Sequence, residues 1–413
     1  MGKNWKRRFS PKEEGRIRRA ISQKVQFFAP TISPAPKNVD RNEIESLDSA
    51  IRYFYENGAQ GVVIQPKYMG SYCDIYMRRE IGESRFYSRR GYPVRLDHEE
   101  MINSIRSLHD HLFDELFPHA DLIIVQSELM PWYALGGGLI ERDFGGYGIS
   151  HRAHHAYLDS TSLNDDVQKL LQDPNYHQFL IDQGTMDRKT LKAAYPAHIV
   201  SQYEALFALS LPDLKEYKED IDLFDKQLKR YGADEPLHFK PFNILKIVYS
   251  DGLEKIPDDH TTFSMVSDID LAMTFRFDGD GNPPGPENDR YLDEMIKKAY
   301  EFYSNIIGHK KMEGVVVKPI GSWNPDVVPM FKVRSNDYLQ LIYGVNFNRD
   351  FDYYLSRRGV GKKMRASKNQ WNIAQAVLRI PMADISKDHE EYTRLVRARI
   401  YEEDFEKTLD SRL

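Results

Sequence analysis

The chain has 413 residues, which suffice for a large buried core and favour two structural units. Its 57 basic and 62 acidic side chains leave a formal net charge of -5, so a nucleic-acid partner would need a local basic patch. The single cysteine, Cys73, excludes a disulfide framework and a cysteine-built zinc site. Because no apolar run approaches the ~18 residues of a membrane span and no signal-peptide core is found, we expect a cytoplasmic protein without membrane contact.

The N-terminal part is predicted to contain a basic arm, a helix and the first strands. Residues 1–36 combine a strongly basic segment, interpreted as a mobile or loosely helical arm, with a proline-punctuated extended stretch. The arm is either a solubilising tail or a nucleic-acid contact. A helical pattern over 42–57 ends at Gly58, and residues 60–65 and 72–78 are typical of two strands.

The turn between these two strands carries a lysine. In the string VVIQPKYMGS (62–71), a run of β-formers delivers Lys67 to a turn that Gly70 closes. A lysine nucleophile needs neighbours that lower the pKa of its amine, and a glycine lets backbone approach a phosphate closely. On this string alone, an ordinary turn at the end of a strand explains the pattern at least as well. The interpretation therefore depends on partners elsewhere in the chain.

Two further strands and a long helical stretch follow. Residues 85–94 favour a strand with a turn, and 121–130 form an apolar, β-branched run typical of a buried strand. From about 150 to 236, helical patterns predict a helical insertion. A histidine cluster at its start could be a metal site or a polar surface group: His151, His154 and His155.

The last part of the chain returns to strands and ends in helices. Residues 237–252 predict a strand with a turn, and a helix over 288–307 precedes the strands 313–320 and 327–335. Residues 350–413 are basic and helical in pattern. The sequence as a whole predicts an α+β fold of antiparallel sheets flanked by helices.

Charged side chains fall on several of the predicted strands. Glu128 ends a buried strand, where a carboxylate is costly unless it binds a metal, a cation or a ribose hydroxyl. Glu313 and Lys318 are five residues apart, which places them on opposite faces of a regular strand unless a bulge intervenes. Lys332 and Arg334 share a face and would form a two-pronged cation site for phosphate charge. Taken one at a time, each of these charged residues is explained by a salt bridge in the core or by a solvated strand edge. Taken together, they indicate phosphoryl chemistry.

In this order, KYMG, SELMPW, EGVVVK and FKVR resemble the motifs of the covalent nucleotidyltransferase superfamily of polynucleotide ligases and capping enzymes. The chain is most similar to the ligase domain of the bacterial polynucleotide kinase-phosphatase RNA-repair system. APTISP, the RRG turn, KPFNIL, YLQLIYG and LSRRGVGKKMRASKNQWNIAQAVLRI extend the likeness, which is weakest over the helical insertion. The resemblance implies an adenylyltransferase fold. The helical pattern after residue 350 favours RNA ligases, without the OB-fold of DNA ligases and capping enzymes.

The resemblance implies an ATP-dependent RNA ligase that acts in three steps. Lys67 would attack the α-phosphate of ATP, release pyrophosphate and form lysyl-AMP. AMP would then pass to a 5′-phosphate on RNA, and a 3′-OH would attack, seal the strand and release AMP. Phosphoryl transfer depends on positioning and charge neutralisation, so Mg²⁺ (or Mn²⁺) is implied as a cofactor beside ATP.

The resemblance also assigns roles to the charged residues. Lys67, Lys318 and Lys332 would be catalytic, and the last two would contact the α-phosphate. Glu128 and Glu313 would bind metal, with the ribose as an alternative for Glu128. The other nucleotide contacts would come from Gln65, Tyr68, Gly70, Arg89, Phe242 and Arg334, with Phe239 as an alternative for stacking on adenine.

The sequence departs from its relatives beside the lysine. Gln65 stands where relatives tend to carry glutamate, and Tyr72 where they usually carry arginine. Ser127 stands where aspartate or glycine is often found. The first two departures leave the handling of the substrate open.

The C-terminal region contains a basic run that suits a nucleic-acid backbone. Residues 356–368 carry six basic and no acidic side chains, and could clamp the RNA backbone or form a solvated basic helix. The predicted RNA contacts are Arg357, Arg358, Lys362, Lys363 and Arg365. The predicted domains are the arm with its extended segment (1–36), the nucleotidyltransferase domain (37–349) and a helical module (350–413).

The expected partners are RNA with 5′-phosphate and 3′-OH ends and a second protein. Because the chain has no G-x-x-x-x-G-K-[ST] motif, any healing of RNA ends must come from another protein. Two alternatives stay open: an adenylyltransferase subunit that needs a partner for sealing, and a non-catalytic scaffold that binds RNA ends.

Overall fold

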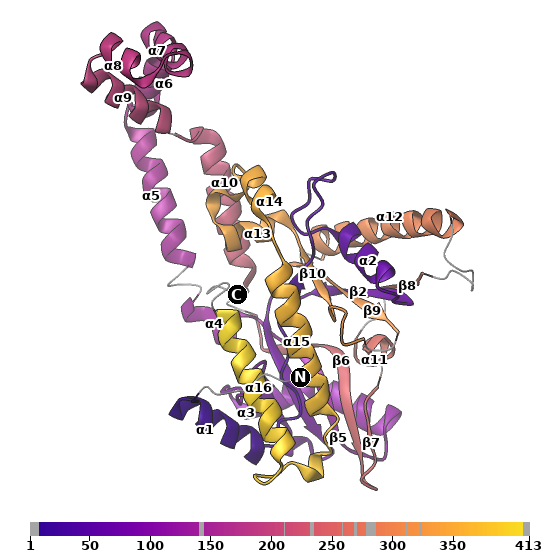
Figure 1. The fold of residues 1–413 in the computed structure, drawn as a ribbon. Helices are drawn as coiled ribbons and strands as arrows, with labels where there is room; N and C mark the ends of the chain where they lie inside the picture. The colour runs from indigo at the N-terminus through magenta and orange to yellow at the C-terminus, as the bar shows by residue number, and fades with distance from the viewer. Residues whose placement is uncertain are drawn as a thin grey trace.

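The computed structural model describes residues 8–139, 144–209, 211–231, 235–257, 259–267, 271–277, 286–310, 312–321 and 324–407. Two five-stranded sheets form its centre, helices cover them, and a helical arm projects from one end (Figure 1). The first sheet has the order β1-β10-β9-β2-β8: β1 (Ser33–Pro34), β2 (Gly61–Lys67), β8 (Met273–Arg276), β9 (Gly314–Ile320) and β10 (Phe331–Arg334). The second has the order β4-β3-β5-β6-β7: β3 (Ser71–Arg78), β4 (Arg85–Ser88), β5 (Ala120–Met130), β6 (His238–Tyr249) and β7 (Glu254–Lys255).

Helices flank both sheets and dominate the C-terminal region. They are α1 (Pro11–Ser22), α2 (Leu47–Glu56), α3 (His98–Asp110), α4 (Tyr133–Leu139), α5 (Gly146–Ser160), α6 (Leu163–Leu171), α7 (Pro174–Thr185), α8 (Arg188–Ala194), α9 (Ala197–Ala208), α10 (Leu214–Leu228), α11 (Asp259–Val266), α12 (Pro286–Gly308), α13 (Asn336–Tyr343), α14 (Phe351–Arg357), α15 (Gly361–Leu378) and α16 (Glu390–Lys407). All strand pairs in the two sheets are antiparallel except β1 with β10. The predicted mixed fold with antiparallel sheets is confirmed.

Strand alternation gives the first sheet one apolar face. Val62 and Ile64 of β2 and Val317 of β9 lie in one buried cluster with Phe54 of α2 and Ile296 of α12. Successive side chains of a strand point to opposite faces, so the residues between these positions point the other way, toward the second sheet. This sheet is therefore dry on its helical side and polar on its inner side.

The second sheet follows the same rule. Ile75 and Met77 of β3 and Ile123 of β5 pack with Ile105 of α3 and Phe113 in another buried cluster. Their neighbours along the strands face the first sheet. The charged side chains that the sequence singles out can therefore meet in the region between the two inner faces, which we call the cleft.

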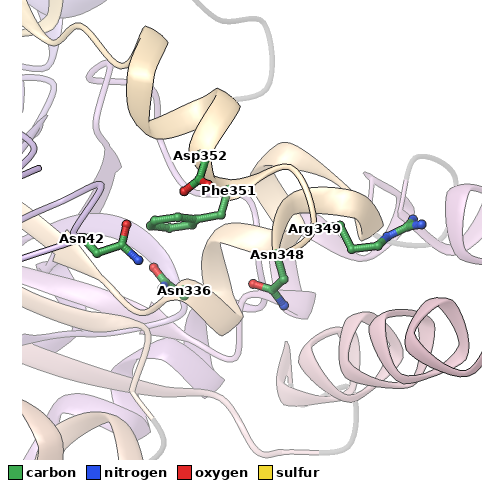
Figure 2. Close-up of a pocket in the computed structure, with 6 residues that line it drawn as sticks. All are labelled: Asn42, Asn336, Asn348, Arg349, Phe351 and Asp352. Carbon is green, nitrogen blue, oxygen red and sulfur yellow. The ribbon is translucent and has the colours of Figure 1, made fainter. Parts of the chain in front are cut away.

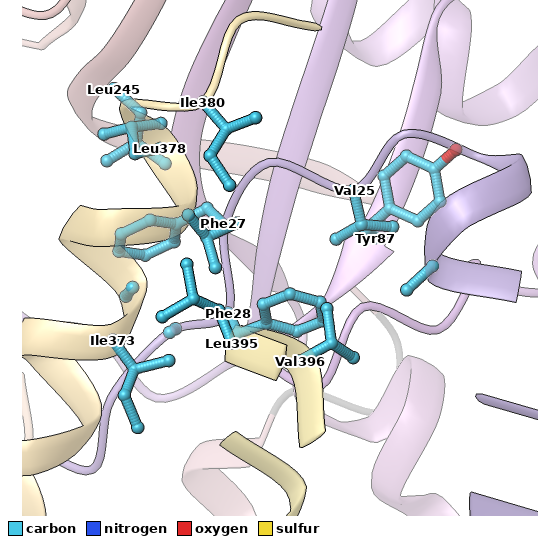
Figure 3. Packing of buried hydrophobic residues seen from close by; sticks show 14 of the residues in the cluster. Val25, Phe27, Phe28, Tyr87, Leu245, Ile373, Leu378, Ile380, Leu395 and Val396 are labelled. Carbon is cyan, nitrogen blue, oxygen red and sulfur yellow. The ribbon is translucent and has the colours of Figure 1, made fainter. Parts of the chain in front are cut away.

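Segments near the two ends of the chain pack together against the second sheet (Figure 3). Phe27 and Phe28 from the N-terminal segment pack with Leu378 of α15, Val396 of α16 and Leu245 of β6. The burial of apolar area here ties the C-terminal helices to the sheets.

The N-terminal segment is ordered rather than a loose arm. α1 begins with a capping box made by Ser10 and Glu13. Arg16 of α1 donates to both carboxylate oxygens of Glu403 on α16, at 2.5 and 2.9 Å, and both residues are buried. This corrects our expectation for the described part; residues 1–7 lie outside the described residues.

The stretch from α5 to α10 forms the projecting arm, with α5 and α10 as its stalk and α6 to α9 as its tip (Figure 1). At the base of the stalk, Tyr217 and Phe224 of α10 share a buried cluster with Met69 of the lysine turn. His151 and His154 contact the Tyr217 hydroxyl with ring nitrogens at 2.6 and 3.2 Å. The histidines thus form a partly exposed polar group between α5 and α10. In the described residues, no helix is long and apolar enough to cross a membrane.

Candidate active site between the two sheets

Lys67 lies at the last position of β2. Its Nζ lies 2.8 Å from Glu313 Oε2, and its side chain keeps 20% of its surface exposed. A Cβ on Gly70 would come within 2.6 Å of Glu128 Cγ and of the Leu129 carbonyl oxygen. The glycine is therefore required because the turn presses against β5, which is a different reason from the predicted approach to a phosphate.

Glu313 and Lys318 both belong to the cleft despite their odd spacing. Glu313 precedes β9 by one residue and lies in a bend, so strand alternation does not govern its direction. Its backbone N–H donates to the Lys67 carbonyl oxygen at 3.3 Å. Lys318 pairs with Val63, two and four residues from Gln65 and Lys67, and so shares their face of the sheet.

Glu128 brings a carboxylate from the second sheet to the lysine. Burial raises its pKa from 4.5 to about 7, the nearby Lys67 opposes this shift, and Glu313 adds to it. The backbone of Gly70 also hydrogen-bonds to this carboxylate. Glu128 and Glu313 thus lie on opposite sides of the lysine amine, one from each sheet.

Lys332 is a buried cation beside this group. Burial lowers its pKa well below the usual range, the charges of Arg334 and Lys67 lower it further, and Glu45 and Glu313 oppose them. No hydrogen bond or ion pair to its ammonium is found within the described residues. A bound anion next to the Lys332 ammonium would therefore stabilise its charged form.

Arg334 does not form the predicted second prong of a phosphate site. Its guanidinium donates to Glu45 at 2.6 and 3.1 Å, and its backbone N–H donates to the same carboxylate at 3.0 Å. Arg358, a predicted RNA contact, also donates to Glu45, at 2.8 Å, and to the Tyr343 hydroxyl. Both expectations are corrected for the same reason. The Glu45 carboxylate has no exposed surface, and it forms ion pairs with both guanidinium groups.

The two candidate aromatics are separated by the fold. Phe239 stacks on Phe86 with ring centroids 5.3 Å apart, in the core beneath α3. Phe242 is half-buried in the cleft, 6.3 Å from the Tyr72 ring, and the Lys318 ammonium lies 5.2 Å from its centroid. Only Phe242 therefore faces the charged residues, and it stays the predicted partner of adenine.

A polar network surrounds Tyr72 that sequence reasoning missed. The Tyr72 hydroxyl donates to Asp74 at 2.5 Å and accepts from the Gln126 amide at 2.7 Å. Gln126 in turn accepts from Asn243 at 2.9 Å, and Thr262 donates to Asn243. Asp74 could have been suspected, because it lies two residues after Tyr72 on the same face of a strand.

The other predicted nucleotide contacts are placed differently. Gln65 is 2% exposed on the inner face of β2, and its amide nitrogen has no partner in the described part of the chain. Tyr68 is buried in the lysine turn. Arg89 instead donates to the Ala29 carbonyl at 3.4 Å and to the Thr31 hydroxyl, so it fastens the extended N-terminal segment.

The basic residues of the C-terminal region divide between the surface and the interior. The Arg357 guanidinium lies 4.9 Å from the exposed Tyr353 ring. On α15, Lys362 and Arg365 are exposed, and Lys363 is half-buried. These side chains stay predicted RNA contacts, unlike Arg358.

The residues present fit a nucleotide with a divalent metal. Glu128 and Glu313 supply hard oxygen ligands, and the phosphates of a nucleotide would supply more. Among the described residues, no group of three or more histidine, cysteine or acidic side chains could hold a metal alone. Gln65 and Lys332 add an unpaired buried donor and a buried cation facing the same cleft.

The fold and site define an adenylyltransferase of the ligase class, and comparison with known proteins agrees. Residues 18–172 match the family described as "PNKP adenylyltransferase domain, ligase domain". No curated protein matches. The "Structure of Pnkp1/Rnl/Hen1 complex" contains a chain 39% identical, with a TM-score of 0.86, over 97% of this chain and 98% of that chain. A chain in the "Structure of the Pnkp1/Rnl/Hen1 RNA repair complex" is also 39% identical, with a TM-score of 0.88, over 98% and 100%.

The protein therefore belongs to the family of the PNKP ligase domain. The predicted resemblance is confirmed. The two solved chains match nearly all of this sequence, so the similarity extends through the helical arm beyond residue 172, where the family match ends.

Proposed function

We propose that the protein is an ATP-dependent RNA ligase that joins 5′-phosphate and 3′-OH ends through lysyl-AMP and RNA-adenylate intermediates, in RNA repair. The observation that carries this proposal is the half-buried Lys67 amine, 2.8 Å from Glu313 and close enough to the buried Lys332 for their charges to interact. One of the two solved relatives belongs to a complex named for RNA repair, which supports the same substrate class.

The residues of the cleft divide the first step between them. The Lys67 amine must lose a proton before it attacks the α-phosphate, and the Glu313 carboxylate is placed to accept that proton. Lys332 and Lys318 would neutralise charge on the phosphate, where a preorganised cation stabilises the transition state most. Phe242 would stack on the adenine, and Gln65 would offer its unpaired amide to the nucleotide.

A metal would complete this arrangement. Mg²⁺ or Mn²⁺ held by Glu128 and Glu313 would supply charge neutralisation for the phosphates. AMP then leaves Lys67 for a 5′-phosphate on RNA, and the 3′-OH of the second end displaces AMP to form the new phosphodiester.

Intact mass after incubation with ATP and magnesium tests the proposal. The wild type should gain the mass of one AMP, and Lys67→Ala should gain none. Arg276→Ala, at an exposed position on the first sheet, is the matched control and should behave as the wild type. No gain in wild-type protein shown to begin unadenylated contradicts autonomous chemistry.

A second candidate function is an adenylyltransferase subunit that needs a protein partner for sealing. It is favoured by one observation, that both solved relatives come from complexes of several proteins. Lysyl-AMP formation without sealing of 5′-phosphorylated RNA, restored by partner proteins, would support this candidate. RNA binding without any lysyl-AMP, with or without partners, would support the non-catalytic scaffold.

A further inference from the structure

A polar hollow lies outside the cleft, where the loop before α2 meets α13 and α14 (Figure 2). Its volume is about 350 Å³, and it is lined by Asn42, Asn336, Asn348, Arg349, Phe351 and Asp352. We propose that this hollow binds an unpaired nucleobase of the RNA strand that is being sealed. The inference rests on the proposed function and adds a binding site to it.

The lining has the chemistry of base recognition. Asn42 and Asn336 are exposed, and their amides have no hydrogen-bond partner within the described residues. Each amide offers a donor and an acceptor side by side, which matches the edge of a base. Figure 2 shows these two side chains beside the Phe351 ring, which is held by a T-shaped contact with Phe347 at 5.7 Å. An anchored aromatic ring with a half-exposed surface can stack on a base.

The charges of the hollow disfavour a phosphate. Asp352 contributes a carboxylate to the lining. Arg349 extends away, since its guanidinium pairs with Asp220 at 3.3 Å and lies 5.1 Å from the centroid of Tyr217 (Figure 2). Asn348 also hydrogen-bonds to Asp220, which fixes its amide. The group that fits is uncharged, planar and rich in hydrogen-bonding atoms.

A second hollow adjoins the first and reaches the end of β10. Its volume is about 450 Å³, it shares Asn42 and Asn336 with the first, and it is also lined by Arg334 and Ser335. The Ser335 backbone N–H donates to the Glu313 carbonyl oxygen at 3.0 Å, and the Glu313 side chain contacts Lys67. The lining of the two hollows is therefore connected to Glu313 and the lysine through the backbone of Ser335.

RNA with a single abasic nucleotide tests this site. The probe is a 5′-phosphorylated single-stranded RNA, with the abasic position moved one nucleotide at a time, and binding is measured by fluorescence anisotropy. The wild-type protein should lose about tenfold in affinity at one position, as expected for the loss of one stacked base. The double variant Asn42→Gly/Phe351→Leu should lose about tenfold on intact RNA and nothing further at that position. Glycine suits position 42, where φ is 56°, and leucine keeps contact with the core.

The control variant is Asn103→Ala, an exposed amide on α3 at the other end of the molecule (Figure 1). It should bind both RNAs as the wild type does, and thermal unfolding should show that all variants fold. If the double variant loses a further tenfold in affinity on the abasic RNA, the variant and the missing base act independently, and the proposed base site is wrong. The absence of RNA binding by the wild type would also contradict it. Lysyl-AMP formation is measured on the same proteins. Its absence in the wild type contradicts the proposed function, whereas an abasic effect that the double variant abolishes still supports the pocket.

Discussion

Two neighbouring cations on β10 show how differently the fold uses the same charge. Arg334 donates three hydrogen bonds to Glu45, whereas the Lys332 ammonium makes neither a hydrogen bond nor an ion pair with any described residue. Glu45 raises the pKa of Arg334 despite burial, while burial lowers the pKa of Lys332 well below its usual range. The arginine is a structural residue, and the lysine is available to an anion.

Buried carboxylates divide in the same way. Glu45 is bound by Arg334 and Arg358, and Glu403 by Arg16 and Arg399, so both hold distant segments together. Asp74, in the cleft, has only the Tyr72 hydroxyl, and its second oxygen has no partner in the described ranges. The carboxylates of Glu45 and Glu403 thus form ion pairs with arginines, whereas the Asp74 carboxyl has no cationic partner among the described residues.

The largest expected effect comes from breaking the framework. Glu45→Gln should lower the free energy of unfolding by about 3–5 kcal/mol, because it leaves two buried guanidinium groups without their carboxylate. Urea denaturation measures this loss. Glu56→Gln, at an exposed position on α2, is the control and should change stability by less than about 0.5 kcal/mol. Equal effects in the two variants would show that Glu45 has no structural role.

Lys332→Met should separate stability from chemistry. We expect the rate of lysyl-AMP formation to fall about 10²–10³-fold, as when a preorganised electrostatic contact is removed. The free energy of unfolding should stay the same or rise, because a buried cation without a partner is replaced by an apolar side chain. Arg334→Met should instead destabilise the protein. If both variants lose stability equally, the contrast between the two cations is wrong.

Asp74 predicts a pH dependence of stability. Burial raises its pKa well above the usual range, so the folded protein keeps a proton that the unfolded chain releases above about pH 4. The free energy of unfolding should therefore fall as the pH rises from 4 toward the pKa of the folded state. Asp74→Asn should remove this fall and add about 1–3 kcal/mol at pH 7.5.

Urea denaturation of both proteins at pH 4.5 and 7.5 measures this dependence. The control is Asp222→Asn on the exposed side of α10, which should keep the wild-type pH profile. Parallel profiles for Asp74→Asn and the wild type would contradict the assignment.

The smallest expected effect concerns the exposed basic residues. Lys362→Ala/Arg365→Ala should weaken RNA binding by a few-fold and reduce the slope of log K against log salt by about 1.4, because two backbone contacts to a single strand are lost. Their stability should be unchanged. Arg358→Ala should do the opposite and destabilise the protein, since its guanidinium is bound to Glu45. An unchanged salt slope in the double variant would show that Lys362 and Arg365 do not contact the RNA backbone.

Local patterns in the sequence predicted the strands and the positions that face the cleft. The alternation of β2 and the position of Lys67 at its end follow from residue type and period. Spacing could not distinguish Lys332 from Arg334, because both lie on one face of one strand. Their difference depends on Glu45, nearly 290 residues away in sequence. Pairing across such distances is a property of the tertiary fold.

Two further features were outside the reach of spacing rules. Glu313 joins Lys318 in the cleft because β9 begins one residue later than the sequence suggests. Gly70 is needed by its contact with β5, which only the packed turn reveals. A strand boundary and a close backbone approach are both set by packing, so composition and period do not specify them.

The contact between Met69 and α10 gives the arm a thermodynamic connection to the nucleophile. Met69 lies two residues from Lys67 and is buried against Tyr217, Ile221 and Phe224 of the returning stalk helix. If the docking of this helix changes the affinity of the lysine site for a ligand, that ligand must change the docking by the same coupling free energy. The buried cluster around Met69 is a physical route for such a coupling between the arm and the lysine.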